Sequence, residues 1–421
     1  MKYCYNLAVR VYGVAILTAC LFNGKARRWK RGRKGIFAAL EKTFGGGKEP
    51  VAWFHCASLG EFEQGRPVIE AFRKNKPGYK ILITFFSPSG YEVRKDYTGA
   101  DFVFYLPLDT PANARRFVET VHPEIALFIK YEFWFNYLHT LQEKKVPVYL
   151  ISAVFRSNSY FFKSYASWFR KQLHGYRKIF VQDTHSEHLL NGAGITCTEV
   201  AGDTRFDRVA AIAAAAQADP KVEKFKGDGR LWICGSTWEA DEKMIAAVFS
   251  QLTAREEKIR LLIVPHEISE DRINGLLSAF PGAIRYSQAD EADSFSSAIM
   301  IVDAVGLLSS LYRYGNVTYV GGGFGKGIHN LPEAAVFGIP VLFGPNHRRF
   351  IEAGELIVRG GGFAVSGADE MFRVLSLLLN DKVYLERSGK AAREYILSSQ
   401  GATEKVMMAI AAGRAPHNAV R

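Results

Sequence analysis

One stretch of the chain decides the fold class. It reads Val317-Thr318-Tyr319-Val320-Gly321-Gly322-Gly323-Phe324-Gly325-Lys326-Gly327-Ile328-His329-Asn330-Leu331-Pro332-Glu333-Ala334-Ala335. The first four residues predict a strand, and the glycines that follow allow a close approach of the backbone to a ligand. Pro332 suits the first turn of a helix, where its missing N–H is not needed. A strand, a glycine-rich turn and a helix in this order predict one βα unit of an α/β protein.

The same stretch predicts a nucleotide site. Free backbone N–H groups at the start of a helix favour phosphate binding. His329 and Asn330 add side-chain donors, and Glu333 is placed to accept hydrogen bonds from ribose hydroxyls. The glycine spacing fits neither the dinucleotide fingerprint nor the Walker loop, which disfavours a dehydrogenase or a kinase. We interpret the stretch as a site for a nucleotide leaving group, and the alternative is a plain turn that binds nothing.

Apolar runs alternate with helical patterns along most of the chain. Strands are predicted over 51–55, 80–85, 102–105, 125–130, 146–152 and 178–181, and again over 231–235, 259–264, 283–285, 298–302, 317–320 and 340–343. Helical patterns over 371–379 and 383–412 close the chain. An alanine-rich segment at 210–220, followed by a charged one, separates the two series. The pattern predicts two Rossmann-like domains that face a cleft, 35–212 and 213–421, with the last helix returning toward the first domain.

Residues 1–34 have a different composition. Arg10 is the only charge in the apolar segment 7–22, whereas 25–34 holds seven Lys and Arg and no acid. The apolar segment is short for a spanning helix, which needs about 20 residues. Cations that follow it favour retention of the chain on the cytoplasmic side and attraction to anionic lipid. We predict a membrane anchor helix with a basic collar, and the alternatives are a buried first helix with a solvated basic loop, or a nucleic-acid site.

The bulk composition narrows the function classes. A chain of 421 residues with 48% hydrophobic residues is typical of a two-domain globular protein and not of a polytopic membrane protein. Its five cysteines lack paired metal-ligand spacing, so neither a disulfide nor a zinc site is predicted. The net charge of +12 is concentrated in the collar, and no RNA-binding motif is present, so no nucleic-acid partner is predicted.

Charged residues follow several predicted strands of the first half. Glu61 comes after strand 51–55, where a carboxylate can act as general base, although Ser58 and Glu61 also have the spacing of a capping box. Glu132 follows strand 125–130. Arg156 and Arg205 have donors suited to a carboxylate or phosphate, although isolated arginines are more often surface ion-pair residues.

The second half places three more turns at strand ends. Ser236 and Glu239 again have capping-box spacing, in a turn that contains Trp238. Pro265 and His266 end another strand, and residues 303–308 follow a third. A nucleoside is expected to lie across these turns, although His266 alone is equally consistent with a packed loop histidine.

Taken together, these segments resemble the 3-deoxy-D-manno-octulosonic acid (Kdo) transferases of lipopolysaccharide synthesis. The resemblance spans nearly the whole chain and depends on the order of five motifs, which are Ser58-Leu59-Gly60-Glu61, Glu132-Phe133-Trp134, Gly202-Asp203-Thr204-Arg205-Phe206-Asp207, Gly235-Ser236-Thr237 and Gly327-Ile328-His329-Asn330-Leu331-Pro332-Glu333-Ala334-Ala335. It implies the two-domain GT-B glycosyltransferase fold. It further implies CMP-Kdo as donor, a lipid A precursor (lipid IVA) as acceptor, and an inverting displacement at the cytoplasmic face of the inner membrane.

The resemblance also implies roles for individual residues. Glu61 would be the general base, and Glu132 and Arg205 would stabilise the transition state. CMP would contact a set of residues from three turns of the second half, which are Pro265, His266, Val305, Gly306, Leu307, Gly327, His329, Asn330, Leu331, Pro332 and Glu333. No acidic metal cage accompanies the glycine loop, so we expect neither a metal nor a cofactor.

Several positions depart from the family pattern. Arg205 stands where the family usually has lysine, and Trp238 where it usually has histidine. His266 directly follows Pro265 without the usual intervening arginine, and the usual Met-Gly-Glu is Val305-Gly306-Leu307. Two alternatives therefore stay open, a GT-B enzyme that uses a UDP-sugar and a catalytically silent, membrane-associated nucleotide binder.

Overall fold

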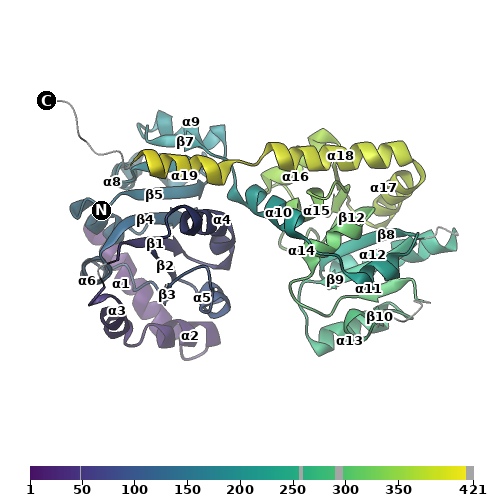
Figure 1. Ribbon diagram of the computed structural model, residues 1–421, viewed down its shortest axis with the longest axis horizontal. Coiled ribbons are helices and arrows are strands. Elements are labelled where there is room, and N and C mark those ends of the chain that lie inside the picture. The colour runs from purple at the N-terminus through teal and green to yellow at the C-terminus, as the bar shows by residue number, and fades with distance from the viewer. Residues whose placement is uncertain (48, 256–258, 290–296, 414–421) are drawn as a thin grey trace. The chain divides into compact units, whose positions relative to one another are not determined.

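The computed structural model describes residues 1–47, 49–255, 259–289 and 297–413. The chain divides into two compact units (Figure 1). Unit 1 contains Met1–Asp207 together with Gln400–Arg421, and unit 2 contains Arg208–Ser399. Each unit is built on one seven-stranded sheet in which all pairings are parallel. Alternating strands and helices thus produce the predicted pair of α/β units.

Unit 1 has the strand order β3-β2-β1-β4-β5-β6-β7. Its strands are β1 (Val51–Cys56), β2 (Lys80–Phe85), β3 (Phe102–Tyr105), β4 (Pro123–Ile129), β5 (Val148–Ala153), β6 (Lys178–Val181) and β7 (Thr198–Val200). Its helices are α1 (Lys2–Ala19), α2 (Gly24–Gly32), α3 (Ile36–Phe44), α4 (Leu59–Asn75), α5 (Pro88–Arg94), α6 (Pro111–Val121), α7 (Phe135–Glu143), α8 (Ser167–Leu173), α9 (Thr184–Gly192) and α19 (Ala402–Ala412). The order reverses between β1 and β4, and such a switch point is where open α/β sheets bind ligands.

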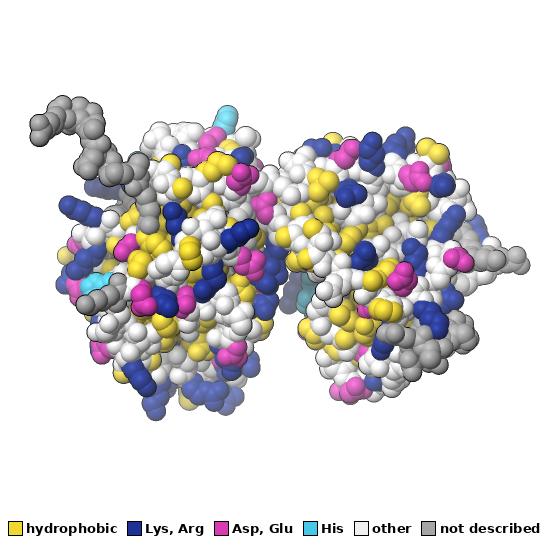
Figure 2. Space-filling model, viewed as in Figure 1, with side chains coloured by type: hydrophobic (Ala, Val, Ile, Leu, Met, Phe, Trp, Pro, Cys, Tyr) yellow, Lys and Arg dark blue, Asp and Glu magenta, His cyan; other side chains and the backbone are white. Residues whose placement is uncertain are grey.

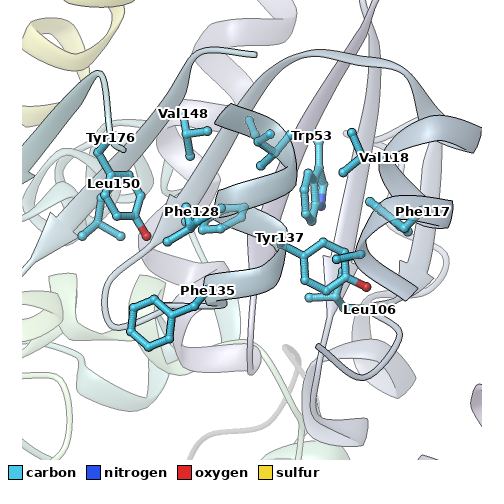
Figure 3. Packing of buried hydrophobic residues seen from close by; sticks show 14 of the residues in the cluster. Trp53, Leu106, Phe117, Val118, Phe128, Phe135, Tyr137, Val148, Leu150 and Tyr176 are labelled. Atoms are coloured by element: carbon cyan, nitrogen blue, oxygen red, sulfur yellow. The ribbon is translucent and has the colours of Figure 1, made fainter. Parts of the chain in front are cut away.

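The core of unit 1 lies on both faces of its sheet. Side chains alternate along β1, so that Trp53 belongs to the cluster on one face while Phe54 belongs to the cluster on the other. Trp53 packs against Phe117 and Phe128, with ring centroids 4.8 and 5.2 Å apart (Figure 3). All six residues of β1 are buried, as expected for a parallel strand covered on both faces.

Unit 2 has the strand order β10-β11-β9-β8-β12-β13-β14. Its strands are β8 (Arg230–Thr237), β9 (Ile259–Pro265), β10 (Ile284–Arg285), β11 (Ile299–Ile301), β12 (Val317–Val320), β13 (Val341–Phe343) and β14 (Gly362–Ala364). Its helices are α10 (Thr204–Ala215), which begins in unit 1, α11 (Pro220–Lys226), α12 (Glu239–Ala254), α13 (Glu270–Ala279), α14 (Leu308–Leu311), α15 (Pro332–Ala335), α16 (Ile351–Arg359), α17 (Ala368–Asn380) and α18 (Lys382–Ser398). Here the order reverses between β8 and β12.

The structure corrects the sequence-based predictions in two places. It adds β7 and β14, whose three residues each lack an apolar run long enough to signal a strand. It also divides the helical pattern over 383–412 into α18 and α19, because Gly401 adopts φ +102° between them.

Helix α19 belongs to unit 1 although it follows unit 2 in the chain. Its Val406 and Ile410 are buried in the same cluster as Phe54. Asp207 caps its start, since the two carboxylate oxygens accept from the N–H groups of Gly401 and Thr403, each at 2.7 Å.

Polar contacts join α1 to the rest of unit 1. Tyr5 donates to Oδ2 of the buried Asp109 at 2.5 Å, and the Asn136 amide donates to Asn6 at 2.9 Å. In the described part of the chain, no single helix has both the length and the apolar character needed to cross a bilayer. The segments Lys2–Ala19 and Gly24–Phe44, bent by 120°, meet those criteria only as a pair.

Candidate functional site

The loops after β1 and β4 flank the switch point of the first sheet. Strand β1 ends at Cys56, and Glu61 lies in the first turn of α4. Strand β4 ends at Ile129 and is followed by Lys130, whose φ of +67° is uncommon for a residue with a side chain. The chain then reaches Glu132 before α7 begins. The two predicted carboxylates therefore follow the carboxyl ends of two adjacent strands.

Glu61 is half-buried, and a neighbouring hydroxyl holds its carboxylate. Ser58 Oγ donates to Oε2 of Glu61. The Ser58 side chain makes no hydrogen bond to the backbone of α4, so the predicted alternative of a capping box is wrong. Burial raises the pKa of the Cys56 thiol, and the negative charges of Glu61, Glu132 and Glu63 raise it further. Three carboxylates thus act on one buried sulfur.

A buried network of rings fixes Glu132, which is only 8% exposed. The Trp134 indole nitrogen lies 2.5 Å from Oε2 of Glu132 and 2.8 Å from Nε2 of His55. Nε2 of His55 is itself 3.3 Å from Oε2 of Glu132. Thr84 Oγ1 holds the other His55 nitrogen at 2.9 Å and accepts from Trp53 Nε1 at 2.8 Å. These bonds leave the Glu132 side chain one orientation, a form of preorganisation that suits an electrostatic role.

Tyr131 lies among the remaining charged candidates of unit 1. Burial raises the pKa of the Tyr131 phenol; the charges of Asp183 and Glu61 raise it further, whereas those of Arg156 and Arg205 lower it. The charges of Glu61, Arg156 and Arg205, three of the candidate residues, therefore all act on the Tyr131 phenol.

An ion pair with Asp203 holds the Arg205 side chain. Its Nε and a terminal nitrogen contact Oδ2 of Asp203 at 2.8 and 2.7 Å, and Asp203 is buried. The neighbouring Thr204 hydroxyl donates to the Gln64 carbonyl of α4 at 2.5 Å. This bond ties the turn that carries Arg205 to the helix that carries Glu61.

In unit 2 the glycine loop follows β12, next to the switch point of the second sheet. The N–H groups of Gly321, Gly322, Gly325, Gly327 and His329 donate to protein oxygens. These five amides are therefore not available to a phosphate, and the predicted free N–H groups at the start of the following helix stay a prediction. The buried Asp241 organises the loop: its carboxylate accepts from the N–H of Gly322, the N–H of Trp238 and the hydroxyl of Tyr319, at 2.9, 2.9 and 2.6 Å.

Asp241 also corrects the predicted cap of α12. The helix begins at Glu239 with Trp238 as its N-cap residue, and the acid that bonds to the cap backbone is Asp241 instead of Glu239. Ser236 lies before the cap with φ +53°, inside the irregular end of β8. The predicted pairing of Ser236 with Glu239 is therefore two residues out of register with the observed pairing of Trp238 with Asp241.

Three rings stack beside the glycine loop. His266 stacks against both Trp238 and His329, with centroid distances of 4.7 and 4.2 Å. The Trp238 indole N–H donates to Nε2 of His329 at 2.9 Å. An indole N–H can only donate, so this His329 nitrogen carries no proton and Nδ1 is the protonated one. Burial lowers the pKa of His329 to about 4, assisted by His266 and opposed by Asp241. His329 is thus a neutral ring with one N–H to offer a ligand.

The other predicted nucleotide contacts lie on neighbouring turns. Glu333 accepts from the Asn330 amide at 2.6 Å and from the Ser309 hydroxyl at 2.8 Å, which joins the glycine loop to α14. Leu331 and Pro332 are buried, so neither side chain is available to a ligand. The turn before α14 contains the exposed Val305, Gly306 with φ +88° and the half-buried Leu307, and Pro265 is buried at the end of β9.

Sequence reasoning missed several residues that shape these sites. His55, Thr84 and Asp241 are polar residues buried within elements whose pattern signals packing. The signal for His55 was a histidine in an otherwise apolar strand, and the signal for Asp241 was an acid in the first turn of a helix. Within the described ranges, no group of three or more His, Cys, Asp or Glu side chains is arranged to hold a metal ion.

The fold resembles those of two solved enzymes. UDP-GlcNAc 2-epimerase from Neisseria meningitidis aligns with a TM-score of 0.63 at 15% identity, over 86% of this chain and 100% of that one. A glycosyltransferase from Rickettsia africae aligns with a TM-score of 0.56 at 12% identity, over 86% and 98%.

Sequence comparison is more specific than the fold. Residues 21–208 match the family model described as 3-deoxy-D-manno-octulosonic-acid transferase. The transferase of that name from Bordetella pertussis is 27% identical over 96% of this chain and 98% of its own length. The one from Haemophilus influenzae is 26% identical over 84% and 85%. In sequence, this chain is therefore similar to Kdo transferases over nearly its whole length.

Proposed function

We propose that this protein is a GT-B glycosyltransferase of lipopolysaccharide synthesis that transfers Kdo from CMP-Kdo to a lipid A precursor. Similarity to Kdo transferases supports the transferase class. The observation that carries the mechanism is the placement of Glu61 at the switch point of the first sheet, beside the fixed carboxylate of Glu132. Unit 1 then holds the acceptor and unit 2 holds the donor.

In this proposal Glu61 removes the proton from an acceptor hydroxyl. The oxygen attacks the anomeric carbon of Kdo, the bond from that carbon to the phosphate oxygen breaks, and CMP leaves with the electron pair. A single displacement inverts the configuration at the carbon. Half-burial and the Ser58 hydroxyl orient the Glu61 carboxylate, as a general base requires.

Fixed charges complete the proposed chemistry. Glu132 has the orientation given by Trp134 and His55, and Arg205 the orientation given by Asp203. Because they need no rearrangement during the reaction, they are suited to stabilise charge that develops in the transition state. On unit 2, the Nδ1–H of His329 and the exposed Lys326 are donors for the phosphate of CMP.

We also propose attachment to the cytoplasmic face of the inner membrane through residues 1–34. The outer side of α1 carries Leu7, Val11 and Val14, which are 64, 59 and 62% exposed and recur at helical spacing. The basic α2 follows directly, and an apolar helix face beside cations is typical of a helix that lies in the membrane interface.

Substitution of Glu61 tests the reaction. Glu61→Gln should lower transfer of Kdo to tetraacylated lipid A precursor by roughly 10²- to 10⁴-fold while leaving CMP affinity unchanged, since a general base contributes that range. Mass analysis of the lipid measures the product, and titration calorimetry measures CMP binding. The matched control is Glu63→Gln on the same helix, whose carboxylate pairs with Arg94 at 2.7 Å. Full activity of Glu61→Gln would reject this residue as the base.

The donor is tested separately. Purified protein is incubated with the acceptor lipid and either CMP-Kdo or a set of UDP-sugars. Product with CMP-Kdo alone supports the proposal. Product with a UDP-sugar alone would keep the glycosyltransferase class and overturn the donor, and absence of product with every donor would favour a silent nucleotide binder.

A further inference from the structure

A large cavity lies beside the collar, away from the residues that the proposed reaction uses. Its volume is about 1050 Å³, at the upper end of the range of small-molecule sites. Helices α1, α2, α3 and α6 and the turn after β3 supply its walls. The apolar part of the lining includes Leu17, Leu21, Phe37 and Leu108.

Cations surround this apolar lining. Arg27, Lys30, Arg31 and Lys34 all line the cavity, and none of its lining residues is acidic. Among the residues that the structure describes, none of these four side chains is paired with a carboxylate. Two further cations line the cavity, Arg33 and Arg116, and Arg116 is paired with Glu41 at 2.7 Å. Lys and Arg side chains gather at the lower edge of unit 1, where α2 lies (Figure 2).

Arg33 forms the wall between this cavity and the proposed catalytic residues. Its guanidinium donates to the carbonyls of Leu106 and Phe86, each at 2.8 Å, and stacks on Trp29 at 3.8 Å. Phe86 in turn packs against Trp134 on the far side, with ring centroids 4.7 Å apart. The donors of Arg33 are therefore used inside the protein, and the charge available to a ligand comes from the other four cations.

The sheet order also separates the cavity from Glu61 and Glu132. The cavity is lined by residues after β3, the edge strand, whereas the two carboxylates follow β1 and β4. Parallel strands are about 4.8 Å apart, so β1 is about 10 Å and β4 about 14 Å from β3. None of the predicted catalytic residues lines the cavity.

We propose that this cavity binds one anionic phospholipid of the bilayer, with its headgroup phosphate on the collar cations and an acyl chain along the apolar lining. The charge of the rim selects an anion, and the apolar lining selects a chain. The exposed apolar face of α1 leads into the cavity through Leu17 and Leu21, which are 48 and 71% exposed, so a lipid can enter from the membrane side. The inference deepens the proposed membrane attachment and does not depend on the transfer reaction.

Native mass spectrometry of the full chain in detergent tests the site. We expect one phosphatidylglycerol to be retained per chain and phosphatidylcholine to be retained far more weakly. The variant Arg31→Gln/Lys34→Gln should bind phosphatidylglycerol about 30-fold more weakly, since each cation near a lipid headgroup is worth about fivefold. Arg28→Gln is the matched control, because Arg28 lies on the same helix but outside the cavity.

A second variant tests the cavity without a change of charge, so that the proposal does not depend on correct folding of Arg31→Gln/Lys34→Gln alone. Ala38 lines the cavity and is exposed on α3, so Ala38→Trp fills the space without changing charge, and it should abolish retention of the lipid. Equal retention of phosphatidylcholine, or equal weakening by Arg28→Gln, would overturn the proposal. Displacement of phosphatidylglycerol by the acceptor lipid would also overturn it, because the cavity would then belong to the acceptor site. No donor sugar is present, so failure of the proposed reaction would not affect this result.

Discussion

Replacement of Trp238 by phenylalanine tests how the ring stack sets the protonation of His329. The indole N–H is a donor that only the neutral form of His329 can accept at Nε2. A net hydrogen bond of about 1 kcal/mol corresponds to about 0.7 pKa unit. Phenylalanine keeps a ring beside His266 but removes the donor. We therefore expect the pKa of His329, which is about 4 in the native stack, to rise by about 0.7 unit in Trp238→Phe.

Nuclear magnetic resonance of the histidine ring nitrogens provides the assay. At neutral pH the chemical shifts identify which His329 nitrogen carries the proton, and an acid titration gives the pKa in both proteins. The companion variant His266→Gln removes a stacked ring and a neighbouring titratable group, so it should also raise the pKa of His329. The reasoning fails if native His329 is protonated on Nε2, or if Trp238→Phe titrates like the native protein.

Three further predictions concern stability, nucleotide binding and the need for a metal. Thr84→Val leaves Trp53 Nε1 and His55 Nδ1 without this partner and should lower the free energy of unfolding by about 3 kcal/mol. The control Thr140→Val, whose hydroxyl bonds only within its own helix, should lower it by about 1 kcal/mol or less. Denaturant titration measures both. Gly322→Ala should weaken CMP binding and lower the melting temperature, because φ is +92° and a Cβ would lie 2.5 Å from a carbonyl oxygen, while Gly325→Ala meets nothing closer than 3.6 Å. Transfer should persist after chelation, and loss that only a divalent ion restores would contradict the proposed metal-free reaction.

The strands that carry strong apolar runs were predictable from the sequence. Twelve of the strands in the structure fall where alternating βα patterns place them, and β1 is a clear case because every residue in it is buried. β7 and β14 were missed, because Thr198–Val200 and Gly362–Ala364 are short outer strands whose pairing depends on a neighbour already in place. Such strands depend on tertiary structure more than on local propensity.

The site could be predicted only in part. Strand ends and motif order pointed to Glu61 and Arg205, whose charges both act on the Tyr131 phenol. The partners that orient the site were not visible, because the chain separates them widely: His55 and Trp134 meet across 79 positions, and Gly322 and Asp241 across 81. The hydrogen bonds of the glycine loop were not visible in the sequence either. The Gly235 carbonyl and Asp241 accept from Gly321 and Gly322, and carbonyls within the loop accept from Gly325, Gly327 and His329.

The return of α19 to unit 1 has a consequence for synthesis of the protein. Domains generally fold as the chain emerges from the ribosome, beginning with the N-terminal one. Here the nascent first domain must wait for the entire second domain before Val406 and Ile410 cover its sheet. Until then, the apolar side chains that α19 covers are exposed to solvent, where chaperones can bind them. Expression of residues 1–207 alone should accordingly give an insoluble product, and a co-expressed peptide spanning 400–413 should improve its solubility.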